Sequence, residues 1–65
     1  MNLTVNGQAH KSGAVTLTAL LEELGYSGAT VATARNGEFV SADSRDAEHV
    51  EEGDKIEILA PMKGG

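Results

Sequence analysis

The chain has 65 residues, no cysteine, and ten acidic against five basic residues, which gives a formal net charge of −5. A chain of this length is expected to form one domain that buries only about 60% of its surface on folding, which leaves a thin core and no deep pocket. The composition excludes a disulfide framework, a thiolate zinc site and a cysteine nucleophile, and the negative charge disfavours nucleic acid and anionic lipid but attracts a basic protein surface.

The N-terminal stretch predicts a β-hairpin and is not expected to be a secretory signal. "MNLTVNG" has neither the basic segment nor the apolar run of a secretory signal, and no stretch approaches the roughly 20 apolar residues of a membrane span, so a soluble cytoplasmic protein is expected. "NLTV" alternates apolar and polar residues and runs into Asn6-Gly7, a strong hairpin signal. The return strand is expected in "QAHKS", with Gly13 as the break after it.

The segment "TLTALLEELG" predicts one short amphipathic helix. Thr16 is placed to cap its N-terminus, and Gly25 is placed to stop it. A helix this short does not hold its shape alone in water, so its apolar stripe must pack on a sheet. That stripe consists of Leu17, Leu20, Leu21 and Leu24.

The second half of the chain predicts three more strands. "TVATARNG" indicates a strand closed by a second Asn-Gly pair, and "EFV" begins the strand that returns from it. Residues 41–53 are irregular and polar, with one helical turn expected over residues 44–48, and "KIEILA" follows as the last strand. In that strand Ile56, Ile58 and Ala60 share a face. The order predicts an α+β domain in which one helix covers one face of a small sheet, and it leaves the strand order open.

No pattern in the chain predicts a catalytic or metal site. His10 and His49 lie far apart with no further ligand at zinc spacing, so both are expected to be surface residues. Six of the ten acids fall between residues 43 and 54 without the spacing of a calcium loop, which favours a solvated acidic face. The serines lack the companions of a nucleophile and the glycines do not form a phosphate loop, so no cofactor is expected to be bound by the chain itself.

Leu59 stands out because alternation places it on the face opposite Ile56 and Ile58, where a solvated sheet should carry a polar residue. Single exposed leucines are common, but beside Met62 it would form an apolar spot that favours docking of a partner. Phe39 is a candidate for the same spot, with a place in the core as the alternative. The predicted partner-binding residues are therefore Leu59, Met62 and Phe39.

The sequence closes on "APMKGG", and residues 61–65 are expected to form a flexible tail. Termini often fray and glycine is frequent in tails, so an inert end is one interpretation. The other is a working arm, because Pro61 releases the chain from the sheet and five extended residues reach about 17 Å, enough to enter another protein's active site. A carboxylate on Gly65 needs activation before it can donate its acyl group, typically as an acyl adenylate, and two residues without a side chain let it thread a narrow channel.

The layout of two hairpins and one helix, the stretches "RNGEFV" and "VEEGDKIEILAPM", and the closing Gly-Gly resemble the thiamine-biosynthesis sulfur carrier (ThiS) family along the whole chain. The resemblance implies a ubiquitin-like β-grasp fold, with a small mixed sheet packed on one main helix and the last strand parallel to the first. It further implies that Gly65 is the modified residue, that Gly64 gives access, and that Pro61, Met62 and Lys63 form the lead to them.

The resemblance also implies a protein cosubstrate rather than an enzyme, and a monomer is expected. An adenylyltransferase similar to ubiquitin-activating enzymes would use ATP and magnesium to adenylate Gly65. A cysteine desulfurase would supply the sulfur of the resulting thiocarboxylate, and thiazole synthase would receive it. Lys63 departs from the uncharged residue expected there, which bears on the fit to the partner. The alternatives are a sulfur carrier like the molybdopterin-synthase small subunit, a ubiquitin-like protein modifier, and an interaction domain with an inert tail.

Overall fold

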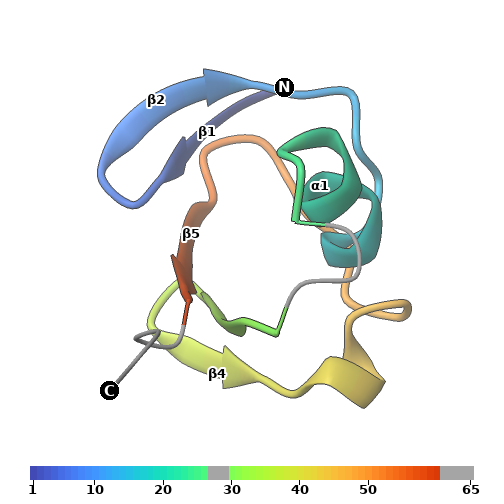
Figure 1. The fold of residues 1–65 in the computed structure, drawn as a ribbon. Coiled ribbons are helices and arrows are strands. Elements are labelled where there is room, and N and C mark those ends of the chain that lie inside the picture. The colour runs from blue at the N-terminus through green and yellow to red at the C-terminus, as the bar shows by residue number, and fades with distance from the viewer. Residues whose placement is uncertain (27–29, 61–65) are drawn as a thin grey trace.

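The computed structural model describes residues 1–26 and 30–60, in which one helix covers one face of a five-stranded sheet (Figure 1). The α+β class and both predicted hairpins are confirmed. The described elements are β1 (Asn2–Val5), β2 (Gln8–Lys11), α1 (Leu17–Glu23), β3 (Ala32–Arg35), β4 (Glu38–Val40), the 3-10 helix η1 (Ala42–Ser44) and β5 (Lys55–Leu59). Neither helix in these ranges is long and apolar enough to cross a membrane.

The strand order, which the sequence pattern left open, is β2-β1-β5-β3-β4. β5 pairs parallel to β1 and antiparallel to β3, so the sheet is mixed and the last strand lies at its centre, as the family resemblance implies. Both hairpins turn at Asn-Gly pairs, and Asn6 and Asn36 have φ angles of 51° and 52°. Positive φ at both central residues is the geometry that tight hairpins prefer, and asparagine and glycine tolerate it.

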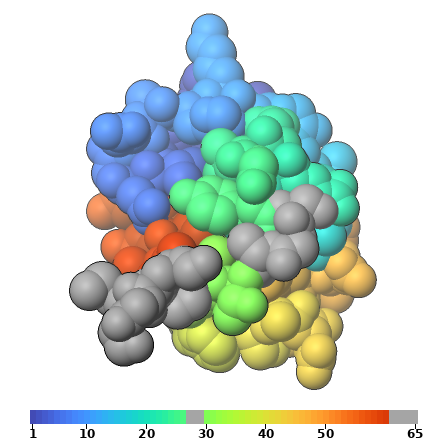
Figure 2. All heavy atoms as spheres, viewed as in Figure 1, coloured from blue at the N-terminus to red at the C-terminus, as the bar shows by residue number. Residues whose placement is uncertain are grey.

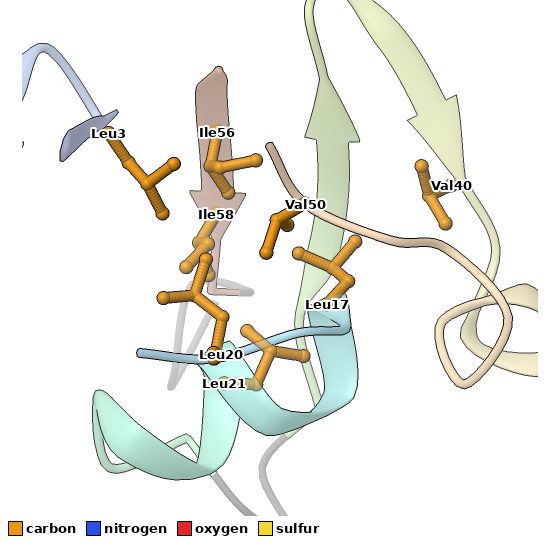
Figure 3. Close-up of a cluster of buried hydrophobic side chains, with 9 residues drawn as sticks. Leu3, Leu17, Leu20, Leu21, Val40, Val50, Ile56 and Ile58 are labelled. Carbon is orange, nitrogen blue, oxygen red and sulfur yellow. The ribbon is translucent and has the colours of Figure 1, made fainter. Parts of the chain in front are cut away.

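The helix lies where its leucine spacing predicts. The Thr16 side chain accepts a hydrogen bond from the Ala19 amide at 3.2 Å, which caps the first turn, and Gly25, at φ 90°, follows the last turn. Leu17, Leu20 and Leu21 of the predicted stripe are buried in the core shown in Figure 3, and Leu24 packs against it half-buried. The buried apolar residues are Leu3, Ala14, Leu17, Leu20, Leu21, Val40, Val50, Ile56 and Ile58.

Two sequence expectations need correction. Ala60 was expected to share the buried face of Ile56 and Ile58, but it is exposed, because the pairing of β5 with β3 ends at Leu59 and Ala60 lies beyond the sheet. The helical turn expected over residues 44–48 begins earlier, at Ala42, where the Ser44 amide donates to the Ser41 carbonyl at 2.9 Å.

Candidate functional site

Two large apolar side chains lie exposed on the sheet face opposite α1. Leu59, the last residue of β5, is 69% exposed, and Phe39 on β4 is 72% exposed. β3 runs between these strands and contributes Ala32, which pairs with Leu59, and Ala34, which pairs with Phe39. We name these four residues the outer apolar patch. The alternative core position of Phe39 is thereby wrong, and the outward position predicted for Leu59 is confirmed.

The patch faces outward because strand residues alternate between the two faces of a sheet. Thr33, Val40 and Ile58, the neighbours of the patch residues along β3, β4 and β5, are all buried on the helix side. At one end of the patch lies a shallow hollow of about 340 Å³, lined by Thr30, Val31, Ala32, Leu59 and Ala60. An exposed apolar surface with a hollow beside it is suited to contact with another protein.

The described part of the chain ends beside this patch. In Figure 2 the end of β5, in orange-red, reaches the surface between the blue β1–β2 hairpin and the green segment that begins at residue 30. Gly65, the predicted modified residue, and the lead through Pro61, Met62, Lys63 and Gly64 lie outside the described residues. Their roles, including the predicted contact of Met62 with Leu59, stay predictions.

The side chains of Asn6 and Asn36, the asparagines of the two hairpin turns, both form hydrogen bonds with the backbone of β5. The Ile58 amide donates to Oδ1 of Asn6 at 2.8 Å, and Nδ2 of Asn6 donates to the Ile58 carbonyl at 3.1 Å. At the other end of the strand, the Lys55 amide donates to Oδ1 of Asn36 at 2.9 Å. Sequence reasoning identified the two turns and missed these bonds, since the Asn-Gly signal is local and the bonds need the strand order.

Asp54 is the main exception to the predicted solvated acidic face. Its carboxylate is buried and accepts hydrogen bonds from Nε of Arg35 at 2.6 Å, from Nδ2 of Asn36 at 3.0 Å and from the Glu51 amide at 2.7 Å. Burial by itself would raise the pKa of Asp54, but these hydrogen bonds and the Arg35 charge outweigh it and lower the pKa. Asp54 therefore stabilises the loop that leads into β5.

Arg35 links this loop to a second acid. Its Nη1 donates to Glu48 at 3.1 Å, and the hydrogen bonds to Asp54 and then Glu48 raise the pKa of the guanidinium. The side chain of Arg35 is 23% exposed and that of Glu48 is 32% exposed, so the pair lies at the edge of the core. Of the six acids in the predicted solvated face, Asp54 and Glu48 instead form ion pairs with Arg35.

A histidine, a serine and a glutamate meet between β2 and α1 without forming a catalytic arrangement. Nε2 of His10 donates to one oxygen of Glu23 at 2.8 Å, and Oγ of Ser12 donates to the other at 3.0 Å. The hydrogen bond from His10 makes the largest contribution to lowering the pKa of Glu23. Because His10 and Ser12 each bond to Glu23, His10 is not placed to remove the proton of the Ser12 hydroxyl.

The two histidines lie as surface or partly buried residues. His10 is half-buried and His49 is exposed. In the described ranges no three His, Asp or Glu side chains converge to hold a metal ion.

A family model described as the ThiS family matches residues 3–65. The chain belongs to the ThiS family. This confirms the predicted resemblance to the sulfur carriers of thiamine biosynthesis. The match begins in β1 and extends through both closing glycines, so it includes all the predicted tail residues as well as the outer apolar patch.

Solved structures agree with the family. The chain is 40% identical to the thiamine biosynthesis protein ThiS from Geobacter metallireducens, whose crystal structure superposes with a TM-score of 0.85 and full coverage of both chains. A solution NMR structure of a thiamine biosynthesis protein from the same organism gives 39% identity and a TM-score of 0.82, covering all of this chain and 88% of that one. The ubiquitin-like β-grasp fold expected of a ThiS protein is confirmed.

One curated relative is much longer. A protein named thiazole synthase from Paramagnetospirillum magneticum is 42% identical over 66 residues, which include the whole of this chain. This chain spans about 20% of that relative's length.

Proposed function

We propose that this ThiS protein carries the sulfur for the thiazole ring of thiamine as a thiocarboxylate on Gly65. The observation that carries the proposal is the family match, which extends through Gly64 and Gly65. The exposed outer apolar patch, which includes the last residue of β5, supports it as a docking surface close to the start of the tail. In this role the chain is a cosubstrate, and the enzymes that act on it supply the catalytic groups.

The first proposed step activates the carboxylate. An oxygen of the Gly65 carboxylate attacks the α-phosphorus of ATP held with magnesium by an adenylyltransferase, and the bond to the bridging oxygen of the β-phosphate breaks. Pyrophosphate leaves and the glycine becomes an acyl adenylate. Catalysis of this step depends on aligning the carboxylate with the phosphorus, which the absence of side chains at both closing residues favours.

The second proposed step exchanges oxygen for sulfur. A thiol reductant first releases hydrosulfide from the persulfide that a cysteine desulfurase forms, and the thiol becomes a disulfide. The hydrosulfide then attacks the acyl carbon, and AMP leaves with the oxygen that joined it to the glycine. The chain itself has no cysteine, so the sulfur must come from a partner. The product is a terminal thiocarboxylate, which is a better nucleophile than the original carboxylate.

Thiazole synthase is the proposed acceptor of the sulfur. The relative from Paramagnetospirillum magneticum bears that name and contains a segment similar to this whole chain. A carrier-like segment within a protein of that name supports a functional link between the two. It favours thiazole formation over molybdopterin synthesis or protein modification as the destination.

Intact mass spectrometry tests the proposal. The chain is incubated with ATP, magnesium, the adenylyltransferase and sulfide, and the expected product is heavier by the difference between one sulfur and one oxygen atom. Omission of ATP is the control and should leave the mass unchanged. An unchanged mass with an adenylyltransferase that is active on another carrier would contradict the proposal.

The outer apolar patch gives a second prediction. In the double variant Phe39→Ser, Leu59→Ser, we expect the KM of the carrier in the adenylyltransferase reaction to rise at least about tenfold. Little change in kcat is expected, because apolar side chains at the centre of an interface supply most of its binding energy. The free energy of unfolding should change by less than about 1 kcal/mol, since both side chains are already in water. The matched control is Val15→Ser, because Val15 is 62% exposed in the loop before α1, away from the patch. Equal KM values for the three proteins would remove the patch from the interface.

A further inference from the structure

β5 extends beyond the strand that pairs with it on one side. The parallel pairing with β1 joins Thr4 to Lys55 and Val5 to Ile56, after which β1 turns away at Asn6. β5 continues to Leu59 and pairs there only with β3. The peptide groups of Ile58 that face the β1 side would have no backbone partner.

The carboxamide of Asn6 pairs with the amide and the carbonyl of Ile58 in place of the backbone of a neighbouring strand. It accepts from the Ile58 amide at 2.8 Å and donates to the Ile58 carbonyl at 3.1 Å, and both bonds are partly shielded from water. An amide side chain carries one donor group and one acceptor group, like a peptide unit. Aspartate lacks the donor and glycine lacks both, although each tolerates the positive φ of this turn.

We propose that Asn6 is a positioning residue for sulfur transfer, which holds Ile58 and so fixes the end of β5, from which the chain continues to Gly65. The inference rests on the function proposed above. Ile58 directly precedes Leu59 of the outer apolar patch, so the same two bonds also orient the patch. The grip of Asn6 thereby relates the docked body of the carrier to its reactive end.

The length of chain between Ile58 and the carboxylate makes this grip matter. Gly65 lies seven residues beyond Ile58 in the sequence, so loosening of Ile58 lengthens the segment that must be ordered before the carboxylate can react. The adenylyltransferase must then realign the carboxylate within its site. Errors of this kind lower the rate of the chemical step more than the affinity of the complex.

Asn36 provides a matched control within the same strand. It occupies the same type of turn, at φ 52°, and its side chain makes two hydrogen bonds, to the Lys55 amide and to the Asp54 carboxylate. These bonds lie at the N-terminal end of β5, away from the tail. Asn36→Gly therefore removes as many side-chain bonds as Asn6→Gly and leaves the exit of the chain unchanged.

The experiment compares Asn6→Gly, Asn6→Asp and Asn36→Gly with the unmodified chain. For each we measure kcat and KM for ATP-dependent adenylation, the urea midpoint of unfolding, and hydrogen exchange at the Ile58 amide. We expect kcat to fall about tenfold in Asn6→Gly and by a smaller factor in Asn6→Asp, which keeps one of the two bonds, with less than a twofold change in KM in either variant. Exchange at Ile58 should rise in Asn6→Gly alone, because aspartate still accepts from that amide. Asn36→Gly should keep the kcat of the unmodified chain even where its urea midpoint falls.

Three results would overturn the inference. Equal kcat values for the unmodified chain and Asn6→Gly would do so, and so would a fall in kcat that is the same in Asn6→Gly and Asn36→Gly, because it would follow lost stability. A chain that is not adenylated even without substitution would overturn the proposed function and this inference with it. Since the unmodified chain is assayed first, the two failures are distinguished.

Discussion

Removal of Gly64 and Gly65 is expected to abolish thiocarboxylate formation and to leave the fold intact. All buried apolar residues of the described core lie between Leu3 and Ile58, so the two glycines are remote from it in sequence. The truncated chain should therefore unfold at the same urea concentration as the full chain. Its carboxylate would lie on Lys63, two residues short of the proposed site of adenylation and beside a bulky side chain.

Intact mass after incubation with ATP, the adenylyltransferase and sulfide measures the first effect, and urea unfolding measures the second. Gly65→Ala is the matched variant, because it keeps the length of the chain and the carboxylate and adds a single methyl group. We expect it to react at a rate reduced by about 10- to 100-fold, because the methyl group restricts the φ angles open to residue 65 and adds bulk at the reacting carboxylate. Full activity of the truncated chain in thiazole formation would exclude the carrier function.

Asp54→Asn is expected to lower the free energy of unfolding by about 2 to 4 kcal/mol, the cost typical of removing the charge from a buried, hydrogen-bonded ion pair. In the unmodified protein Oδ2 of Asp54 lies 2.6 Å from Nε of Arg35. The asparagine side chain has nearly the same shape but gives the Arg35 guanidinium no negative charge. A domain of this length has a total stability of only roughly 3 to 10 kcal/mol. The substitution should therefore remove a large share of the total stability.

The effect of Asp54 also sets a pH dependence. Its pKa is lowered in the folded protein, so the unfolded chain binds the proton more readily than the folded one. The stabilisation is thus fully present above the ordinary pKa of an aspartate carboxyl, about 3.9, and is lost as the pH falls through the lower pKa of the folded state. Asp54→Asn should accordingly show a flatter loss of stability in acid than the unmodified protein.

Urea unfolding at a series of pH values measures both effects of Asp54. Asp43→Asn is the control, because it makes the same chemical change at an exposed residue earlier in the same connection. Asp43→Asn should alter the free energy of unfolding by less than about 0.5 kcal/mol and leave the dependence of that free energy on pH unchanged. Equal stability of the two variants would mean that the buried carboxylate contributes no more than a solvated one.

The parts of the fold that local signals encode were predictable. The Asn-Gly pairs specify both hairpin turns because few residues tolerate positive φ, and the spacing of the leucines specifies which side of α1 is buried. Alternation in the last strand also placed Leu59 on the outer face. Each of these signals lies within a few residues of the feature it predicts.

The features that were missed depend on contacts between distant residues. Asp54 resembles its acidic neighbours in sequence, and what distinguishes it in the fold is its contact with Arg35 on β3 and Asn36 in the second turn. Asn6 grips Ile58 across 52 positions of the chain, a relation that follows from the parallel pairing of the first and last strands. The local pattern contained no sign of that pairing, and only the family resemblance implied it.

The central place of β5 has a consequence for the nascent chain on the ribosome. The sheet joins Thr4 to Lys55, so β1 must wait for β5, which is made after every other strand of the sheet, before the sheet can form. An incomplete polypeptide therefore has no outer apolar patch, because Leu59 is among the last residues of the sheet to be made. The patch can therefore contact a partner only after every strand of the sheet has been made.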